Sequence, residues 1–319
     1  MPPKSSRRGR SNSSRTDTRT QERSRSRDKN SYIMSKEGEE FLLILNNNGG
    51  NIKLGQYIQS GGFASVYSIK NDPNLVCRIT HTSLTDVQVR TESIGLGIQK
   101  VLASYSDNIV KIDEYGLYQV SNPEVAKNYC RERARQDWCF FDENADQEKQ
   151  QKEKNKIDVR EKHFSEKYNE GIYAVMEKIE SDLFDYSLDK LRKLHIEDTI
   201  EIIYAVFVQL MRVVSYIHYY GYVHRDIKLE NIGFVFDEEG KIQIKLFDFG
   251  FAVNTTALIV VKKVGTRGYF DEGLYKYEPL TKKLITPTKE KLEFSDVYAC
   301  GISMLFMIAI ILNKVEKFY

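Results

Sequence analysis

The hydrophobic pattern of the 319-residue chain changes from short stretches to long ones about halfway along it. In the first half, short β-branched-rich stretches are separated by polar or glycine-containing breaks, which is typical of an antiparallel meander. These stretches are residues 52–58, 64–69, 75–80, 108–120 (two short strands) and 172–179, with one helical pattern at 87–104. In the second half, residues 196–220 show helical spacing, and residues 297–312 are apolar all round, which predicts a helix buried on every side. This order predicts an α+β fold of two lobes, a small antiparallel β lobe followed by a mostly helical lobe.

Composition excludes several other classes of protein. Hydrophobic residues make up 41% of the chain and only 6 prolines occur, so most of the chain is expected to fold around a sizeable core. The net charge of +2 is unevenly spread, because residues 1–30 carry a net +7 and the remainder a net −5. A uniformly basic nucleic-acid-binding protein is therefore disfavoured, although a basic arm is not.

Two segments do not share the pattern of a packed core. Residues 1–35 are rich in Ser and Arg and poor in large apolar residues, which predicts a disordered basic tail. Its Arg-Ser alternation suits a solvated tail, a nuclear signal, a phosphorylation target or a nucleic-acid-binding or partner-binding arm at residues 1–30. Residues 121–170 hold 23 charged side chains of mixed sign, which predicts an exposed insertion.

The cysteines and the termini indicate an intracellular protein. Four scattered cysteines, without a CxxC pair, suggest neither a disulfide framework nor a zinc site, so a reducing compartment fits best. No secretory signal is present at the N-terminus, and the longest apolar run, residues 298–312, is shorter than the ~20 residues of a membrane-spanning helix, so no transmembrane segment is expected. Cytoplasm or nucleus is expected, or a virion or infected cell if the Lys-, Ile-, Tyr- and Asn-rich composition marks a viral protein.

The sharpest chemical signal is the decapeptide YVHRDIKLEN at residues 222–231, followed 22 residues after Asp226 by DFG at residues 248–250. These motifs, in this order and after an apolar strand, resemble the catalytic loop and metal-binding turn of eukaryotic-type protein kinases. Lys228, two residues after the aspartate, resembles the serine/threonine-specific branch. The resemblance covers residues 52–319 without the insertion and implies a kinase domain at 36–319, with an N-lobe at about 52–178 and a C-lobe at about 179–319.

The resemblance implies chemistry for four of these residues. Phosphoryl transfer depends on positioning and charge neutralisation. Asp226 would orient the substrate hydroxyl or accept its proton, and Lys228 would place a cation beside the transferring phosphate. Asn231 and Asp248 offer hard oxygen ligands that suit Mg²⁺ bridging the phosphates of ATP.

The expected nucleotide site is completed by residues of the β-rich half. The segment IQSGGFASVY at residues 58–67 resembles the phosphate-covering loop, with Gln59 and Ala64 at two of its three glycine positions. Arg78 stands where kinases carry lysine, and Cys77 is expected over the adenine. Met176 would be the gatekeeper, and Gly233 would lie under the base. The other cofactor-binding residues implied are Ile58, Gly61, Val66, Glu92 as the partner of Arg78, and Glu177 and Lys178 through their backbone.

The segments after the metal-binding turn depart from the kinase pattern. VGTRGY at residues 264–269 resembles the end of an activation segment, but DEG at residues 271–273 replaces the expected A-P-E. A phosphate on Thr255 or Thr256 could pair with Arg225, and a segment ordered without phosphorylation is equally compatible. Asp296 would hold the backbone of the catalytic loop. Kinases of this type usually continue with further helices that cover the one starting near Asp296, and the sequence lacks these.

Two functions from different classes follow. The first is an active serine/threonine protein kinase that transfers the γ-phosphate of ATP to protein hydroxyls, because Asp226, Asn231 and Asp248 are all present. The second is a pseudokinase, a nucleotide-binding or scaffold module, which is favoured by the departures at Gln59, Ala64, Arg78 and residues 271–273 and by the expected short C-lobe.

Overall fold

The computed structural model describes residues 42–45, 50–60, 64–80, 86–120, 170–256, 264–270 and 272–312. The chain divides into residues 1–39 and 40–319, and all described residues belong to the second unit. The predictions for the tail at 1–35, for most of the insertion at 121–170, for Gly61 and for Asp271 lie outside the described residues.

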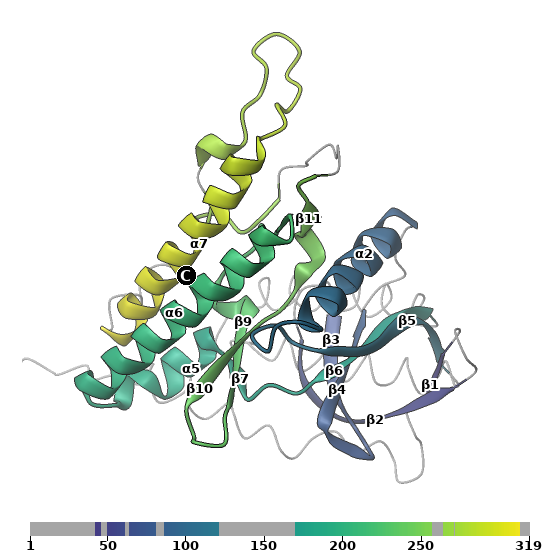
Figure 1. The fold of residues 1–319 in the computed structure, drawn as a ribbon. Helices are drawn as coiled ribbons and strands as arrows, with labels where there is room; N and C mark the ends of the chain where they lie inside the picture. Colours follow the sequence, from purple (N-terminus) through teal and green to yellow (C-terminus); the bar gives the residue numbers. More distant parts are fainter. Residues whose placement is uncertain are drawn as a thin grey trace, which may run out of the picture. The chain divides into compact units, whose positions relative to one another are not determined.

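The first part of the described chain is a closed antiparallel barrel (Figure 1). The strand order is β1-β2-β3-β4-β6-β5, and every neighbouring pair is antiparallel. The strands are β1 (Leu42–Leu45), β2 (Asn51–Ser60), β3 (Ala64–Ile69), β4 (Asp72–Thr80), β5 (Ile112–Val120) and β6 (Glu170–Glu177). Alternate side chains of these strands point to one face and bury a cluster that includes Tyr67, Cys77 and Tyr173.

Two details of the barrel differ from the sequence prediction. Strand β1 was not predicted, although an apolar run before the Asn- and Gly-rich sequence at residues 46–50 is a hairpin signal; β1 pairs with both β2 and β5 and so closes the barrel. Residues 108–120 hold one nine-residue strand and not the two short strands predicted. Ile109, which was counted in the first of these, makes an isolated parallel bridge to Leu246.

Helix α2 (Asp86–Ala103) packs on the outer face of the barrel. Leu96 is buried there against Ile112, Ile172 and Ala174 of β5 and β6. The helix also contacts η3, the short 3-10 turn Phe249–Phe251, so it joins the barrel to the second part of the described chain.

The second part is mostly helical (Figure 1). It has one large hydrophobic core. Its helices α5 (Leu183–Asp189) and α6 (Ile196–Tyr219) pack against a small sheet in the order β10-β9-β7, and α7 (Lys289–Ile311) packs against α5 and α6. The remaining elements are β7 (Ser181–Asp182), β8 (Tyr222–Val223), β9 (Ile232–Phe236), β10 (Ile242–Leu246), β11 (Val253–Asn254), and the 3-10 turns η1 (Leu191–Lys193), η2 (Leu229–Asn231) and η4 (Glu272–Leu274). The predicted α+β architecture with a β-rich part and a helical part is confirmed.

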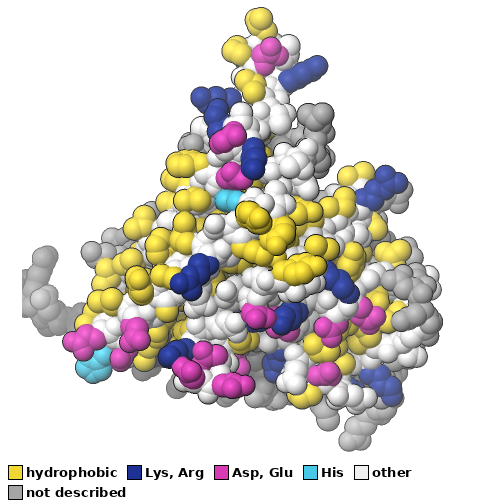
Figure 2. Space-filling model, viewed as in Figure 1, with side chains coloured by type: hydrophobic (Ala, Val, Ile, Leu, Met, Phe, Trp, Pro, Cys, Tyr) yellow, Lys and Arg dark blue, Asp and Glu magenta, His cyan; other side chains and the backbone are white. Residues whose placement is uncertain are grey.

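The sequence predicted that helix α7 is buried on every side, and this prediction is wrong. Cys300 and Met307 face the core, whereas the side chain of Leu305 is 63% exposed, because no described residue covers the opposite face. Figure 2 shows hydrophobic side chains gathered at the surface over α6 and α7. Helices α6 and α7, at 24 and 23 residues, are long and apolar enough to cross a membrane by length and composition, yet each buries part of its length in the core.

Candidate active site

The catalytic loop lies between β8 and η2, where the chain has no regular secondary structure. Asp226 is 6% exposed, and its carboxylate receives hydrogen bonds from three neighbours. The backbone nitrogen and Oγ1 of Thr266 lie 2.9 and 2.7 Å from Oδ1. Lys228 Nζ and Asn231 Nδ2 lie 3.0 and 3.1 Å from Oδ2. Four donors therefore hold one buried carboxylate in a fixed orientation.

The charge of Asp226 is stabilised by this arrangement. Burial alone raises the pKa of the carboxyl group, but the hydroxyl of Thr266 and the ammonium group of Lys228 favour the ionised form and outweigh burial. The pKa of Asp226 consequently lies below its ordinary value. The carboxylate is ionised at neutral pH and can orient a hydroxyl group.

Asp296 of α7 fixes the backbone that leads into this loop. Its carboxylate accepts hydrogen bonds from the backbone nitrogens of His224 and Arg225, both at 2.8 Å. His218 of α6 also contacts it, with 3.0 Å between Nε2 and Oδ2. Arg225 has a φ of 68°, a left-handed conformation that costs energy in a residue with a side chain. Asp296 therefore has the supporting role that the resemblance implied, and His218, to which the sequence assigned no role, shares it.

Asn231 and Asp248 lie at the same end of the β9–β10 hairpin. Ile232 pairs with Leu246 in this hairpin, and the backbone nitrogen of Phe247 donates to the carbonyl oxygen of Asn231 at 3.1 Å. The hairpin therefore brings the residue before β9 next to the residues after β10. Asp248 has a φ of 64°, so the chain turns sharply at the carboxylate.

The side chains of this turn fit Mg²⁺. The amide nitrogen of Asn231 donates to Asp226, which leaves the amide oxygen as a hard ligand, and the carboxylate of Asp248 is exposed. Among the described residues, no group of three or more His, Cys, Asp or Glu side chains could hold a metal ion. The two residues would therefore hold Mg²⁺ only together with oxygen atoms of the nucleotide phosphates, as Mg²⁺ commonly does.

Arg78 of β4 and Glu92 of α2 form an ion pair. Arg78 lies in register between Val66 of β3 and Ala174 of β6, so Val66 is its cross-strand neighbour on the same face of the sheet. The two charged side chains are 19% and 22% exposed. The pairing places a guanidinium group, with its several N–H donors, on the barrel side of the site.

Cys77 does not lie where the sequence predicted it. Successive residues of a strand point to opposite faces, so Cys77 faces away from Arg78 and is fully buried in the barrel interior with Leu54 and Tyr67. Val76, two residues before Arg78, shares the face of Arg78. The prediction of Cys77 over the adenine was therefore wrong by one residue, and burial raises the pKa of its thiol.

The end of β6 is fixed by contacts that the sequence did not predict. The backbone nitrogens of Glu177 and Lys178 donate to the carbonyl oxygens of Lys111 and Asn74, at 3.0 and 2.8 Å. Both N–H groups are therefore already used within the protein. Of the backbone groups of these two residues, only the carbonyl oxygens are left to bond the edge of an adenine. Met176 packs against the cluster of Leu96 beneath α2.

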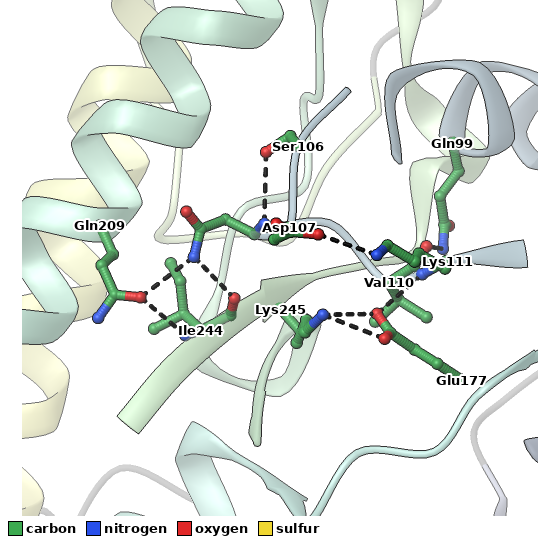
Figure 3. Close-up of polar contacts among 10 residues, drawn as sticks. Gln99, Ser106, Asp107, Val110, Lys111, Glu177, Gln209, Ile244 and Lys245 are labelled. Atoms are coloured by element: carbon green, nitrogen blue, oxygen red, sulfur yellow. Dashed lines mark hydrogen bonds and ion pairs between the residues drawn. The ribbon is translucent and has the colours of Figure 1, made fainter. Parts of the chain in front are cut away.

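Figure 3 shows the side chain of Glu177 between two lysines. Lys245 Nζ of β10 lies 3.0 Å from the carboxylate, and the backbone nitrogen of Lys111 lies 2.9 Å from Oε1. This ion pair connects the barrel to the β9–β10 hairpin. Lys245 is only 4% exposed, so the pair lies in a largely buried environment. A lysine within the apolar strand at residues 242–247 was the sequence signal for it.

The remaining predicted positions lie apart from these contacts. Ile58 is an exposed residue of β2. A Cβ atom on Gly233 would lie 2.4 Å from Cδ1 of Ile179, so Ile179 fills the space that a larger side chain would take. Thr255 Oγ1 donates to the carbonyl oxygen of Gly221 at 3.0 Å.

Comparison with known proteins identifies the class to which this fold and site belong. Residues 53–312 match the protein kinase domain family, so the chain belongs to the protein kinases. A serine/threonine-protein kinase F of Synechocystis is 28% identical over 103 residues, which are 32% of this chain and 19% of that protein. The serine/threonine-protein kinase zyg-8 of Caenorhabditis elegans is 39% identical over 85 residues, 26% of this chain and 10% of that protein. The gamma catalytic chain of mouse phosphorylase b kinase (liver/testis isoform) is 31% identical over 139 residues, 43% of this chain and 30% of that protein. The matched part thus spans less than a third of each of these relatives.

Proposed function

We propose that this protein is a serine/threonine protein kinase that transfers the γ-phosphate of ATP to protein hydroxyl groups. The observation that carries the proposal is the buried carboxylate of Asp226, held by Lys228, Thr266 and Asn231 beside the turn of Asp248. Relatives that match this chain are named serine/threonine kinases, which supports the class of substrate.

Each of these side chains has a task in phosphoryl transfer. Asp226 orients the substrate hydroxyl and accepts its proton as the bond to phosphorus forms. Lys228, which contacts both Asp226 and Thr266, places positive charge beside the transferring group. Asn231 and Asp248 would hold Mg²⁺, which supplies neutralisation of the phosphate charge when it is bound.

On the barrel side, Arg78 neutralises charge on the phosphates that do not leave. Its ion pair with Glu92 fixes the guanidinium group, whose planar shape differs from the compact ammonium group of lysine. If arginine binds the phosphates less well than lysine does, Arg78 lowers the rate of transfer.

The alternative is a pseudokinase that binds nucleotide, or serves as a scaffold, without transferring phosphate. Gln59 and Ala64, which replace glycines in the phosphate-covering loop, and Arg78 support it. The formed Arg78–Glu92 ion pair supports the active enzyme, because kinase chemistry requires the corresponding charge pair to be in place.

Turnover of Mg²⁺·ATP by the purified full chain separates the two. Incorporation of labelled γ-phosphate into a generic basic protein or the chain's own serines is expected, with loss of the signal in Asp248→Asn. Asp237→Asn, in an exposed turn outside the site, is the matched control and should keep the wild-type rate. Binding of Mg²⁺·ATP without any transfer would favour the pseudokinase. A higher rate in Arg78→Lys would show that the arginine limits the reaction.

The basic arm at residues 1–30 and an intracellular location complete the proposal. The +7 charge of the arm supports binding of a nucleic acid or an acidic partner. Deletion of residues 1–30 should remove salt-sensitive binding to nucleic acid while nucleotide affinity stays unchanged, and unchanged nucleic-acid binding after the deletion would exclude this role.

A further inference from the structure

Helix α2 lies directly on the backbone of the metal-binding turn. A Cβ atom on Gly95 would lie 2.7 Å from the carbonyl oxygen of Phe249 and 2.9 Å from Cα of Gly250. Both atoms belong to the backbone and cannot move aside as the end of a flexible side chain can. Any larger residue at position 95 therefore requires the helix and the turn to separate.

The same face of α2 carries Glu92. Residues three apart in a helix are neighbours on its surface, so Glu92 and Gly95 face the turn together. A Cβ atom on Gly250 would lie 3.8 Å from Oε2 of Glu92 and 3.3 Å from Oδ1 of Asp248. The close approach at Gly95 thus brings the carboxylate that binds Arg78 next to the turn that carries Asp248.

We infer that Gly95 is a positioning residue for phosphoryl transfer, which rests on the proposed kinase function. By having no side chain, Gly95 sets the separation between α2 and the Phe249–Gly250 backbone, and this separation places Glu92 so that Arg78 is fixed at the phosphates. Gly95 touches neither the nucleotide nor the transferred group, and it acts through Glu92.

Helix α2 also supplies a matched control. Gly97 lies in the same helix, two residues further on, and a Cβ atom there would lie 3.0 Å from the hydroxyl oxygen of Tyr115, the far end of a movable side chain. Gly95→Ala and Gly97→Ala raise helix propensity equally, because each replaces the same residue in a helix interior. A difference between the two variants consequently reports the contact with the turn.

The test compares kcat/KM for Mg²⁺·ATP in the wild type, Gly95→Ala, Gly97→Ala, Glu92→Gln and the double variant Gly95→Ala/Glu92→Gln. A displacement of about 1 Å can cost on the order of 100-fold in rate, so Gly95→Ala should lose ~10- to 100-fold and Gly97→Ala less than about two-fold. If Gly95 acts through Glu92, Gly95→Ala should cost less than about three-fold in the Glu92→Gln background.

Three results would overturn the inference. They are equal activity of Gly95→Ala and the wild type, full additivity of the two substitutions, and failure of Gly95→Ala to fold when Gly97→Ala folds. The last would mean that the contact is required for folding and does not act by placing Glu92.

The affinity for Mg²⁺·ADP separates this inference from the kinase proposal. If the wild type transfers no phosphate, the proposed function fails, and the inference is then decided by binding alone. Gly95→Ala should weaken Mg²⁺·ADP binding at least about five-fold relative to Gly97→Ala, because Arg78 loses its fixed position. Equal dissociation constants for the two variants would overturn it.

Discussion

The two sides of the candidate site are held in different ways. On the helical side, Asp226 is almost fully buried and receives four hydrogen bonds, and Asp296 fixes the backbone of the same loop from α7. On the barrel side, Arg78 and Glu92 form one ion pair, and each side chain is about one-fifth exposed. Asp226 is held by several contacts, so the loss of one contact leaves the others in place. The position of the Arg78–Glu92 pair depends on how closely α2 approaches the turn of Phe249.

This difference shows which side of the candidate site depends on the packing of neighbouring elements. A carboxylate with several buried donors has one orientation, because each lost hydrogen bond leaves an unsatisfied polar group. A single partly exposed ion pair contributes little energy by itself, so its geometry follows the packing of the elements that carry it. The helical side therefore has a fixed geometry, whereas the geometry of the barrel side follows the packing of α2.

The largest effect is expected from Asp226→Asn, which removes the charge at the centre of the helical side. General-base catalysis contributes about 10²- to 10⁴-fold, so kcat should fall by that factor. Affinity for Mg²⁺·ADP should change by less than about two-fold, because Asp226 is not a nucleotide ligand. Steady-state kinetics and calorimetry measure the two quantities, and an unchanged kcat would contradict the assignment.

The next effect is expected from Asp296→Ala, which removes the support of the catalytic loop. The buried N–H group of His224 and the partly buried N–H group of Arg225 lose their acceptor at about 1–3 kcal/mol each, so the free energy of unfolding should fall by ~2–6 kcal/mol. Asp237 accepts two backbone N–H groups in an exposed turn, and Asp237→Ala should cost less than about 1 kcal/mol. Urea unfolding compares them, and similar losses would show that burial does not decide the cost.

A smaller effect is expected where the two sides join. Lys245→Met leaves the carboxylate of Glu177 without its buried cation, so unfolding should become easier by about 1–3 kcal/mol. Adding Glu177→Gln should recover part of the loss, since the unpaired charge is then removed. Lys241→Met, in an exposed ion pair with Glu239, is the control at less than about 0.5 kcal/mol. No recovery in the double variant would argue against a coupled pair.

The smallest effect is the dependence of stability on pH. The pKa of Asp226 is lower in the folded state than in the unfolded chain, so the ionised carboxylate stabilises the fold above its ordinary pKa of about 3.9. This contribution is lost as the pH falls through the folded-state pKa. The difference in unfolding free energy between the wild type and Asp226→Asn should therefore shrink as the pH is lowered below about 4.

For Asp182, the residue before α5, the dependence of stability on pH has the opposite sign. Burial raises its pKa to about 6, against the hydrogen bond from the backbone nitrogen of Asp185. Its contribution is present below the ordinary pKa of about 3.9 and is lost as the pH rises through about 6. Equal pH dependence of Asp182→Asn and Asp226→Asn would contradict this difference between a half-buried and a buried carboxylate.

Local patterns predicted the elements whose partners are near in sequence. The helix at residues 196–219, the strands at 64–69 and 242–246, and the order of β-rich and helical parts follow from periodicity alone, because burial imposes 2.0- or 3.6-residue spacing on the chain. Strand β1 was missed although its partner β2 follows closely in the sequence, and only its pairing with β5, about seventy residues further along, shows that the sheet closes. Cys77 was placed on the wrong face because one residue reverses the direction of a strand side chain.

The sequence by itself determined which chemical groups this kinase carries, because the catalytic loop and the metal-binding turn are short, contiguous and specific in spacing. Only the tertiary structure decided which groups meet. The contacts of Asp226 with Thr266, of Lys245 with Glu177 and of Gly95 with the Phe249–Gly250 backbone join residues 40 to 155 positions apart. Such contacts form where packed elements cross, and a linear pattern does not record the distance between two elements.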